Sequence, residues 1–334
     1  MNACPPFDHL LVVPHLRVQN ANAVSSPLTH GFPSVTAFLG LMWALERKTR
    51  AAGLDLAFKA VGMVCHAHQE QVTEGGFVKS FRLTRNPIDK DGSTAAIVEE
   101  GRIHLELSLV FAVRSESWSR EPQDAINNDI AKVLALLAGM RIAGGSVLPN
   151  TQPKRSRYQP FSVNLTGTED DQQKEFRQAR GRLLPGSVLV ARDDLLDTRW
   201  SELRKSNDGA TRLDAWLSLS RVNWHYQPGE KEGKGQWQHD RKGLGWIVPI
   251  PVGYGALGEL HAPGSVLNAR DAATPFRFVE SLYSVGEWIS PHRLQSPQQL
   301  LWYADSQPQD GLYRCRNGYH RPDQPGVESL YDFD

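Results

Sequence analysis

"IHLELSLVFAV", residues 103–113, carries the clearest secondary-structure signal in the sequence. Large apolar residues occupy every second position from Ile103 to Val113, and polar residues such as His104 and Glu106 alternate with them in the first half. A period of two is the side-chain period of a strand with one buried face. The stretch therefore predicts a long strand in the core, and the elements around it decide the fold class.

Outward from this strand, helix and strand patterns alternate. Apolar residues at helical spacing fill residues 124–138, with Gly139 as the expected C-cap, and a similar pattern begins after Ser34, a residue type suited to an N-cap. The further strands that we expect are residues 10–19, residues 56–65 and, last, either residues 145–148 or residues 187–191. The order β-α-β-β-α-β is typical of the ferredoxin-like fold of RNA-recognition domains, although that fold hosts many functions.

The predicted fold class is α+β, with a ferredoxin-like, RRM-type head formed by residues 9–66 and 103–192. Residues 67–102 are far more than a hairpin needs, and their turn dipeptides and apolar residues predict an ordered, projecting, thumb-like arm. Residues 193–334 form an elaborated C-terminal extension. We expect it to pack on the head, because it holds seven of the nine tryptophans.

The C-terminal half has a less regular pattern. Its expected elements are helices at residues 195–203 and 213–219, a flexible loop at 229–241 and a strand at 246–251. The tetrapeptide Gly-Ser-Val-Leu begins at Gly145, Gly186 and Gly264, and each copy is expected to be a turn that leads into a strand.

Composition restricts the class of protein. With 40% hydrophobic and 22% charged residues, and no apolar run near the ~18 residues of a membrane span, the chain has the composition of a globular protein of the cytoplasm. The first eight residues lack the basic and apolar parts of a signal peptide. Three scattered cysteines predict reduced thiols. Zero net charge argues against a free-standing nucleic-acid binder unless the charges separate by face.

Catalytic and metal-binding patterns are not found in the sequence. Cys65, His66 and His68 have metal-ligand chemistry, but on a strand the thiol and the imidazoles point to opposite faces, and no second ligand pair follows. The motifs of serine hydrolases, phosphate-binding loops and zinc proteases do not occur. The histidines considered as a general base are His15, His30, His104 and His292. We therefore expect no enzyme activity, no metal and no cofactor.

Polar and basic residues in turn-rich contexts favour nucleic-acid binding. Gln19 to Pro33 is expected to be a loop with more hydrogen-bonding side chains than a turn requires. Arg141 precedes paired glycines, which let a backbone approach a phosphate closely. Two basic stretches, residues 154–157 and 174–182, are either solvated surface or a phosphate track.

Several longer blocks resemble one known family. They include "LRVQNANAVSSPLTHGFPSVTAFLG" from Leu16, "LTRNPIDKDGSTAAIVEEGRIHLELSL" from Leu83, "RIAGGSVLP" from Arg141, "GWIVPIPVGYGAL" from Gly245 and "GEWISPHR" from Gly286. In this order the blocks resemble the second subunit of the type I-F CRISPR Csy surveillance complex, which belongs to the RAMP superfamily of RNA-binding proteins.

The resemblance implies a non-catalytic structural subunit in antiviral defence. It implies a partner large subunit, a grip on the 5′ handle of the CRISPR RNA, a cap on the backbone filament, and target DNA near the foot of the complex. The residues that we expect to contact RNA are Arg17, Gln19, Asn20, Asn22, Ser25, Ser26, Arg85, Asn86, Ser93, Arg102, Arg141, Gly144, Gly145, Asn268, Arg270, Arg277, His292 and Arg293.

Two alternatives remain at this point. One is a RAMP-type, metal-independent ribonuclease that processes precursor CRISPR RNA, with a histidine such as His30 or His104 as general base on a 2′-hydroxyl. The other is a metal-dependent enzyme that uses Cys65 and His68.

Overall fold

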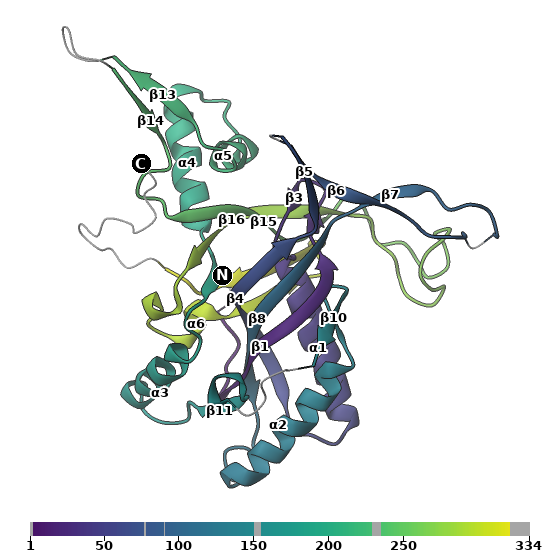
Figure 1. Cartoon of the computed structure of the whole chain (residues 1–334), viewed down its shortest axis with the longest axis vertical. Coiled ribbons are helices and arrows are strands. Elements are labelled where there is room, and N and C mark those ends of the chain that lie inside the picture. Colours follow the sequence, from purple (N-terminus) through teal and green to yellow (C-terminus); the bar gives the residue numbers. More distant parts are fainter. Residues whose placement is uncertain (1–2, 77, 90, 150–154, 229–234, 321–334) are drawn as a thin grey trace.

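The computed structural model describes residues 3–76, 78–89, 91–149, 155–228 and 235–320 (Figure 1). Its main feature is one large sheet whose strand pairs are all antiparallel, so the chain is an α+β protein. The helical elements of the described residues are α1 (Val35–Ala51), α2 (Gln123–Ala138), α3 (Glu169–Gly181), α4 (Asp193–Ser206), α5 (Arg212–Leu219) and α6 (Pro297–Leu300), with the short 3-10 turns η1 (Ser156–Tyr158) and η2 (Pro291–Arg293).

The strands fall into one large sheet and three small ones. The large sheet contains β1 (His9–Asn22), β4 (Ala57–Glu70), β8 (Arg102–Arg114), β9 (Arg141–Ile142), β10 (Gly145–Leu148), β11 (Phe161–Asn164), β12 (Ser187–Ala191), β15 (Trp246–Ala256), β16 (Val279–Ile289), β17 (Trp302–Gln307) and β18 (Leu312–Asn317). Its order is β12-β16-β15-β18-β17-β4-β8-β1-β10-β9, and β11 pairs with the start of β1. The small sheets are β2 (Val24–Ser26) with β3 (Thr29–His30), β5 (Val72–Gly75) with β6 (Val78–Arg85) and β7 (Ile97–Glu100), and β13 (Trp224–Gln227) with β14 (Gln236–His239).

The predicted strand at residues 103–113 is confirmed as β8, which pairs with β1 on one side and with β4 on the other. Two bulges shift the β1–β8 register, and His15 and Asn20 adopt positive φ angles of 51° and 57° beside them. The predicted helices are also confirmed: Ser34 accepts a hydrogen bond from the Thr36 amide at the N-cap of α1, and Gly139 is the C-cap of α2.

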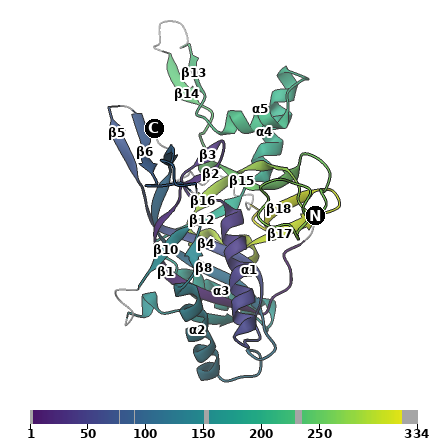
Figure 2. The same ribbon diagram turned by 90° about the vertical axis from the view of Figure 1, so that its right-hand side faces the viewer.

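Each face of the sheet has its own apolar core. Leu11 and Val13 of β1 pack in the cluster that contains the buried residues of α1 and α2. Leu10 and Val12 pack in a second cluster with Phe176 of α3, because successive side chains of a strand point to opposite faces. The alternating pattern in the sequence therefore positions helices on both sides of the sheet (Figures 1 and 2).

Both candidates for the last head strand form strands, but in different places. Residues 145–148 are β10, which pairs with β1, whereas residues 187–191 are β12, which pairs with β16 and with the middle of β4. The third Gly-Ser-Val-Leu copy, at residues 264–267, lies in a loop. The expectation of a strand there is wrong, because no neighbouring strand in the described structure pairs with this copy.

Two expected loops contain strands. Residues 19–22 continue β1, and residues 24–30 form the β2–β3 hairpin, so the expected loop from Gln19 to Pro33 is largely wrong. Within the expected loop at residues 229–241, Gln236–His239 pairs with β13, while residues 229–234 lie outside the described residues. In both cases the pairing supplies hydrogen bonds that the local composition does not indicate.

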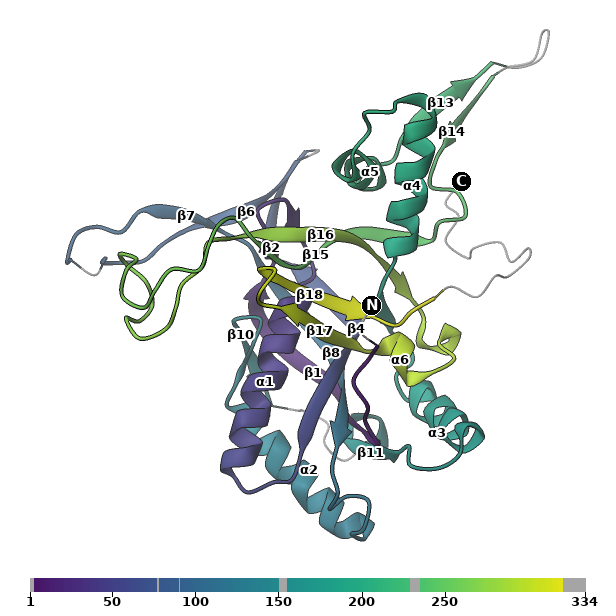
Figure 3. The same cartoon turned by 180° about the vertical axis from the view of Figure 1, so that it is seen from behind.

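The insertion between β4 and β8 forms a three-stranded arm. The strands β5, β6 and β7 project from the body (Figure 1), and a long loop, residues 257–278, projects from the same side of the molecule. Figure 3 shows both projections from behind, and the side view in Figure 2 shows them apart. The arm begins where the pairing of β4 with β8 ends, since Gln71 donates its backbone amide to the Arg102 carbonyl at 2.8 Å.

The C-terminal half continues the large sheet. Trp302 of β17 pairs with Val61 of β4, and its indole donates to the Leu189 carbonyl at 2.8 Å. The predicted helices α4 and α5 are confirmed and, with β13–β14, stand together at one end of the molecule (Figure 1). The division into head, arm and extension remains a prediction. Within the described residues, no helix is both long and apolar enough to cross a membrane.

Candidate nucleic-acid interface

The root of the arm encloses a cavity of about 450 Å³. It lies where the end of β1, the arm and the β9–β10 turn meet. Its lining residues are Gln19, Asn20, Gln71, Arg82, Thr84, Glu100, Arg102, Arg141, Gly144 and Ser146. Five of them were expected to contact RNA, and the fold brings these five together from three separate parts of the sequence.

The charge of this arm-root cavity is positive, because three arginines face one carboxylate. Arg102 forms an ion pair with Glu100 at 3.0 Å, and Arg141 donates to the Gly144 carbonyl at 3.1 Å. The Asn20 backbone amide donates to Nδ1 of His104 at 3.1 Å, which holds the bulged end of β1 in place. Guanidinium groups beside amide and hydroxyl side chains suit a ligand with both phosphates and hydrogen-bonding edges.

A second cavity of about 710 Å³ adjoins the first and shares Arg141 and Gly144 with it. It extends from the β9–β10 turn across the start of α1 to Tyr254 of β15 and Tyr313 of β18. The two tyrosine rings stack with centroids 6.3 Å apart. This tyrosine-lined cavity therefore adds aromatic rings, on which bases can stack, to the positive charge of the arm root.

The expected contacts around the β2–β3 hairpin have partners inside the chain. Asn22 bonds through its side chain to both backbone groups of Val24, at 2.9 and 3.1 Å. The Ser25 and Ser26 hydroxyls bond to Oγ1 of Thr29 at 2.7 and 2.6 Å. These side chains thus hold the hairpin together. Asn22 and Ser25 also line the tyrosine-lined cavity, whereas Ser26 is buried, and contact with RNA stays a prediction for all three.

The two glycines of the β9–β10 turn differ in role. Gly144 has a φ of 80°, which favours glycine, and it lines both cavities. A Cβ at Gly145 would lie 2.7 Å from the Ala21 amide nitrogen, so this glycine permits β10 to pack closely on β1. Arg17 is exposed on β1 opposite Leu148 of β10.

The remaining expected residues occupy three other regions, which are the outer part of the arm, the loop of residues 257–278 and η2. Arg85 and Asn86 lie at the exposed end of β6, and Ser93 donates to Asp91 at 2.6 Å, which lowers the pKa of that carboxyl. In the loop of residues 257–278, Asn268 has a φ of 59°, and Arg277 donates to the Pro308 carbonyl at 3.0 Å.

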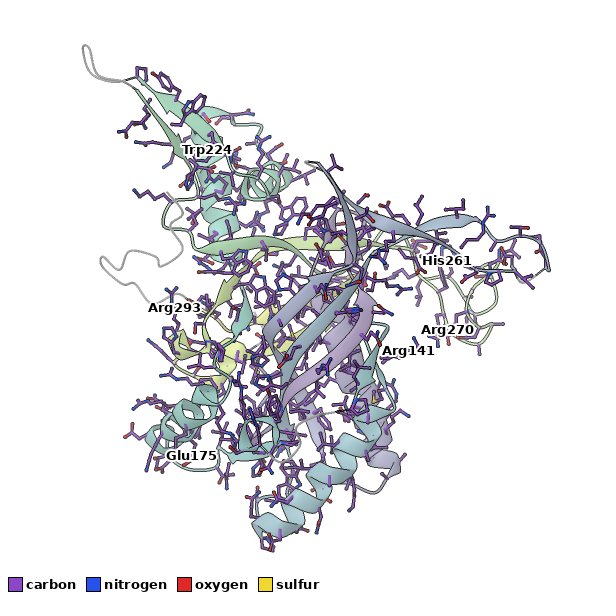
Figure 4. All side chains as sticks on the ribbon, in the orientation of Figure 1. Arg141, Glu175, Trp224, His261, Arg270 and Arg293 are labelled. Carbon is purple, nitrogen blue, oxygen red and sulfur yellow. The ribbon has the colours of Figure 1, made fainter. Side chains whose placement is uncertain are left out.

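The expected residues do not form a single interface. Figure 4 shows Arg270 on the same side of the molecule as Arg141, and Arg293 on the other side. His292, next to Arg293 in η2, bonds to the Ser290 hydroxyl at 2.7 Å, and η2 packs near α3. These two residues thus lie apart from the arm-root cavity.

The sequence did not single out several residues of these cavities. They are Gln71, Arg82, Thr84, Glu100, Ser146, Tyr254 and Tyr313. Arg82 and Thr84 alternate with apolar neighbours on β6, a strand pattern that was available in the sequence. The tyrosines reach the cavity only through the pairing of β15 with β18, which has no local signature.

Comparison with known proteins identifies the family. A family model described as CRISPR-associated protein (Cas_Csy2) matches residues 11–315. The chain belongs to the Csy2 family. The CRISPR-associated protein Csy2 of Pseudomonas aeruginosa (strain UCBPP-PA14) is 45% identical to it over 313 residues, which cover 91% of this chain and 94% of that protein. The match spans the arm, both cavities and the C-terminal strands of this Csy2-family chain.

The histidines that were considered as catalytic groups have partners within the fold. His15 bonds to Glu106 at 2.6 Å and to Arg157 at 2.9 Å, and its ring stacks on His66 with centroids 4.0 Å apart. His30 bonds to Glu70 at 3.2 Å. Residue 154, at the start of one basic stretch, lies outside the described residues.

Cys65 does not have the properties of a reactive thiolate. Burial raises the pKa of its thiol to about 11. Across the described residues, no group of three or more His, Cys, Asp or Glu side chains is placed to hold a metal ion. Cys65 and His68 therefore belong to no such group within the described part of the chain.

Proposed function

We propose that this chain is a non-catalytic, RNA-binding structural subunit of a type I-F CRISPR interference complex and that it grips the 5′ handle of the guide RNA at the arm root. The observation that carries the proposal is the cavity in which Arg82, Arg102 and Arg141 face one carboxylate beside amide and hydroxyl side chains. Proteins that bind single-stranded RNA hold its phosphates with basic side chains and its bases with hydrogen-bonding side chains and aromatic rings.

The arrangement of the first strands supports a ferredoxin-like RAMP head. In the sheet, β4, β8, β1 and β10 are neighbours in this order, and α1 and α2 pack on one face of them. Chain order and sheet order together fit the β-α-β-β-α-β unit, with β5–β7 as the thumb-like arm.

Apolar side chains on the two projections support contact with protein neighbours in a complex. Leu83 and Ile88 of the arm are exposed, and Leu267 in the loop of residues 257–278 is 91% exposed. Such residues are expected to be covered by the large subunit or by an adjacent subunit of the backbone filament, with target DNA near the foot of the complex. Because these neighbours cover much of its surface, the protein needs only one positive face for RNA, which agrees with its zero net charge. We propose that the complex is cytoplasmic.

The test is charge reversal at Arg141, which lines the arm-root cavity, and at Arg85, which lies farther out on the arm. We predict that Arg85→Glu combined with Arg141→Glu weakens binding of synthetic guide RNA and reduces the slope of log affinity against log salt by about 1 for each phosphate that the protein no longer binds. Equilibrium binding across a salt series measures both. Arg120→Glu is the matched control, because Arg120 is an exposed arginine of the body that pairs only weakly, at 3.5 Å, with Glu116. Equal affinity of the double variant and wild type would remove the arm root from the RNA site.

The same material tests the absence of catalysis. Labelled repeat RNA incubated with the protein without metal is expected to stay intact. Specific cleavage that disappears on His30→Ala or His104→Ala would instead identify a ribonuclease.

A further inference from the structure

A third cavity, of about 590 Å³, lies between the head and the C-terminal strands. Its walls come from β3 and the segment that leads into α1, from the far end of β4, and from β15 and β16. Three aromatic rings form one part of its apolar lining, beside aliphatic residues and prolines such as Val248 and Pro249. Phe32 meets Trp288 edge to face at 5.0 Å, and Trp246 lies 6.5 Å from Trp288 at an interplanar angle of 50°. We name it the aromatic cavity.

Polar groups complete the wall of the aromatic cavity. His30 and Glu70 bond to each other at 3.2 Å, and exposed His68 lies on the same wall. Imidazole nitrogens and a carboxylate provide both donors and acceptors. Trp246 is 48% exposed, so the aromatic wall has an accessible surface. A flat ring with a hydrogen-bonding edge matches this combination, whereas an apolar side chain leaves the polar groups unused.

The aromatic cavity is a neighbour of the proposed RNA site. It shares Ser25, Pro33 and Ser34 with the tyrosine-lined cavity, which in turn shares Arg141 and Gly144 with the arm-root cavity. The three cavities thus form one series along the surface, positive at one end and aromatic at the other.

We infer that the aromatic cavity receives one unstacked nucleobase of the guide RNA, which stacks on Trp246 while its edge meets His30, His68 and Glu70. This inference rests on the proposed function. Because Glu70 is an acceptor, the base that fits carries an exocyclic amino group.

The experiment uses the full chain and synthetic guide RNA at fixed salt. Trp246→Ala is expected to weaken binding about tenfold, within the range that stacking of one base contributes. Trp246→Tyr, which keeps a ring, is expected to recover most of the affinity. Trp237→Ala is the matched control, since Trp237 is 64% exposed on β14 and lines none of the three cavities. Equal melting temperatures establish that the variants are folded.

An abasic scan of the RNA identifies the base. At one unpaired position, removal of the base is expected to weaken binding to wild type about tenfold and to leave binding to the Trp246→Ala protein unchanged. If Trp246→Ala binds like wild type while the Arg85/Arg141 double variant binds weakly, the inference is wrong and the proposed function stands. If neither binds weakly, the proposed function fails as well. If the Trp246→Ala protein still binds RNA like wild type but no longer binds the large subunit, the cavity holds a protein side chain, and the inference is overturned.

Discussion

His66 shows how a single half-buried polar residue is held on the sheet. Its Nδ1 bonds to the Pro185 carbonyl at 2.6 Å, which only accepts, so Nδ1 carries the hydrogen and Nε2 accepts from the Ser108 hydroxyl at 2.6 Å. Ser108 is fully buried. Burial, the largest cause, lowers the pKa of His66 to about 4, and the nearby His15 and Arg157 act in the same direction. The imidazole is therefore neutral and serves the packing of β4 against β8.

We predict that this histidine makes folding stability depend on pH. Because the pKa of His66 is about 4 in the folded state and about 6.5 when unfolded, the unfolded chain binds more protons between these values. Stability is thus full above about pH 6.5 and falls as the pH decreases toward 4. Thermal unfolding across this range measures it. In His66→Gln the slope is expected to be smaller, with a remainder from His9, whose pKa is also lowered by burial. An unchanged slope would contradict the assignment.

At the scale of elements, the sequence predicted the strands and helices whose hydrophobic pattern is complete within one stretch. The strand β8 and the helices α1 and α2 have their hydrophobic spacing, caps and bounds within one stretch, and all three are confirmed. The hairpin β2–β3, the extension of β1 beyond Gln19 and the strand β14 were missed, because distant or turn-closing hydrogen bonds stabilise these polar segments. A strand that forms because it pairs with a distant strand can be recognised only when the position of that partner strand is known.

The joint between the sheet and α4 provides a test at this scale. Arg192 is buried, pairs with buried Glu287, and bonds to Asp194 at 2.8 Å. We predict that Arg192→Met lowers the free energy of unfolding by about 3–5 kcal/mol, because it leaves the Glu287 charge buried and unpaired. Urea denaturation measures the change. Arg192→Met with Glu287→Met is expected to recover much of the loss.

An exposed ion pair serves as the comparison. Arg50 pairs with Glu46 at 2.8 Å along α1, and its side chain is largely exposed. Arg50→Met is expected to cost about 0.3–0.5 kcal/mol. Similar losses for Arg192→Met and Arg50→Met would mean that burial does not govern the first pair.

At the scale of the whole molecule, the candidate site is made by topology. The polar end of β1 and the paired glycines after α2 were recognisable as candidates, but their meeting with Arg82 of the arm depends on the β1–β10 pairing and on the exit of the arm beside it. The tyrosines and tryptophans of the other cavities arrive on C-terminal strands that join the same sheet. The types of residue that form the site could be predicted from the sequence, but the sequence did not show which of them lie close together.

The arm can therefore be removed as a unit, and this gives the last prediction. Glu70 of β4 pairs with Ile103 of β8, so a short Gly-Ser turn in place of residues 72–100 closes a simple hairpin. Closing the shorter connection costs no more loop entropy than closing the arm. The main packing contacts that are lost are those of Phe81, which is only partly buried against the core. We predict a melting temperature within a few degrees of wild type, because few buried residues are removed.

The armless chain is expected to lose most of its affinity for guide RNA while its melting temperature changes little. The deletion removes Arg82, Thr84 and Glu100 from the arm-root cavity but leaves Arg141 and the aromatic cavity in place. Residual binding is expected to be weak and still sensitive to Trp246→Ala, whereas a chain that binds RNA at full affinity without its arm would place the RNA site elsewhere. Circular dichroism, thermal unfolding and equilibrium RNA binding on the same preparation separate a loss of the site from a loss of the fold.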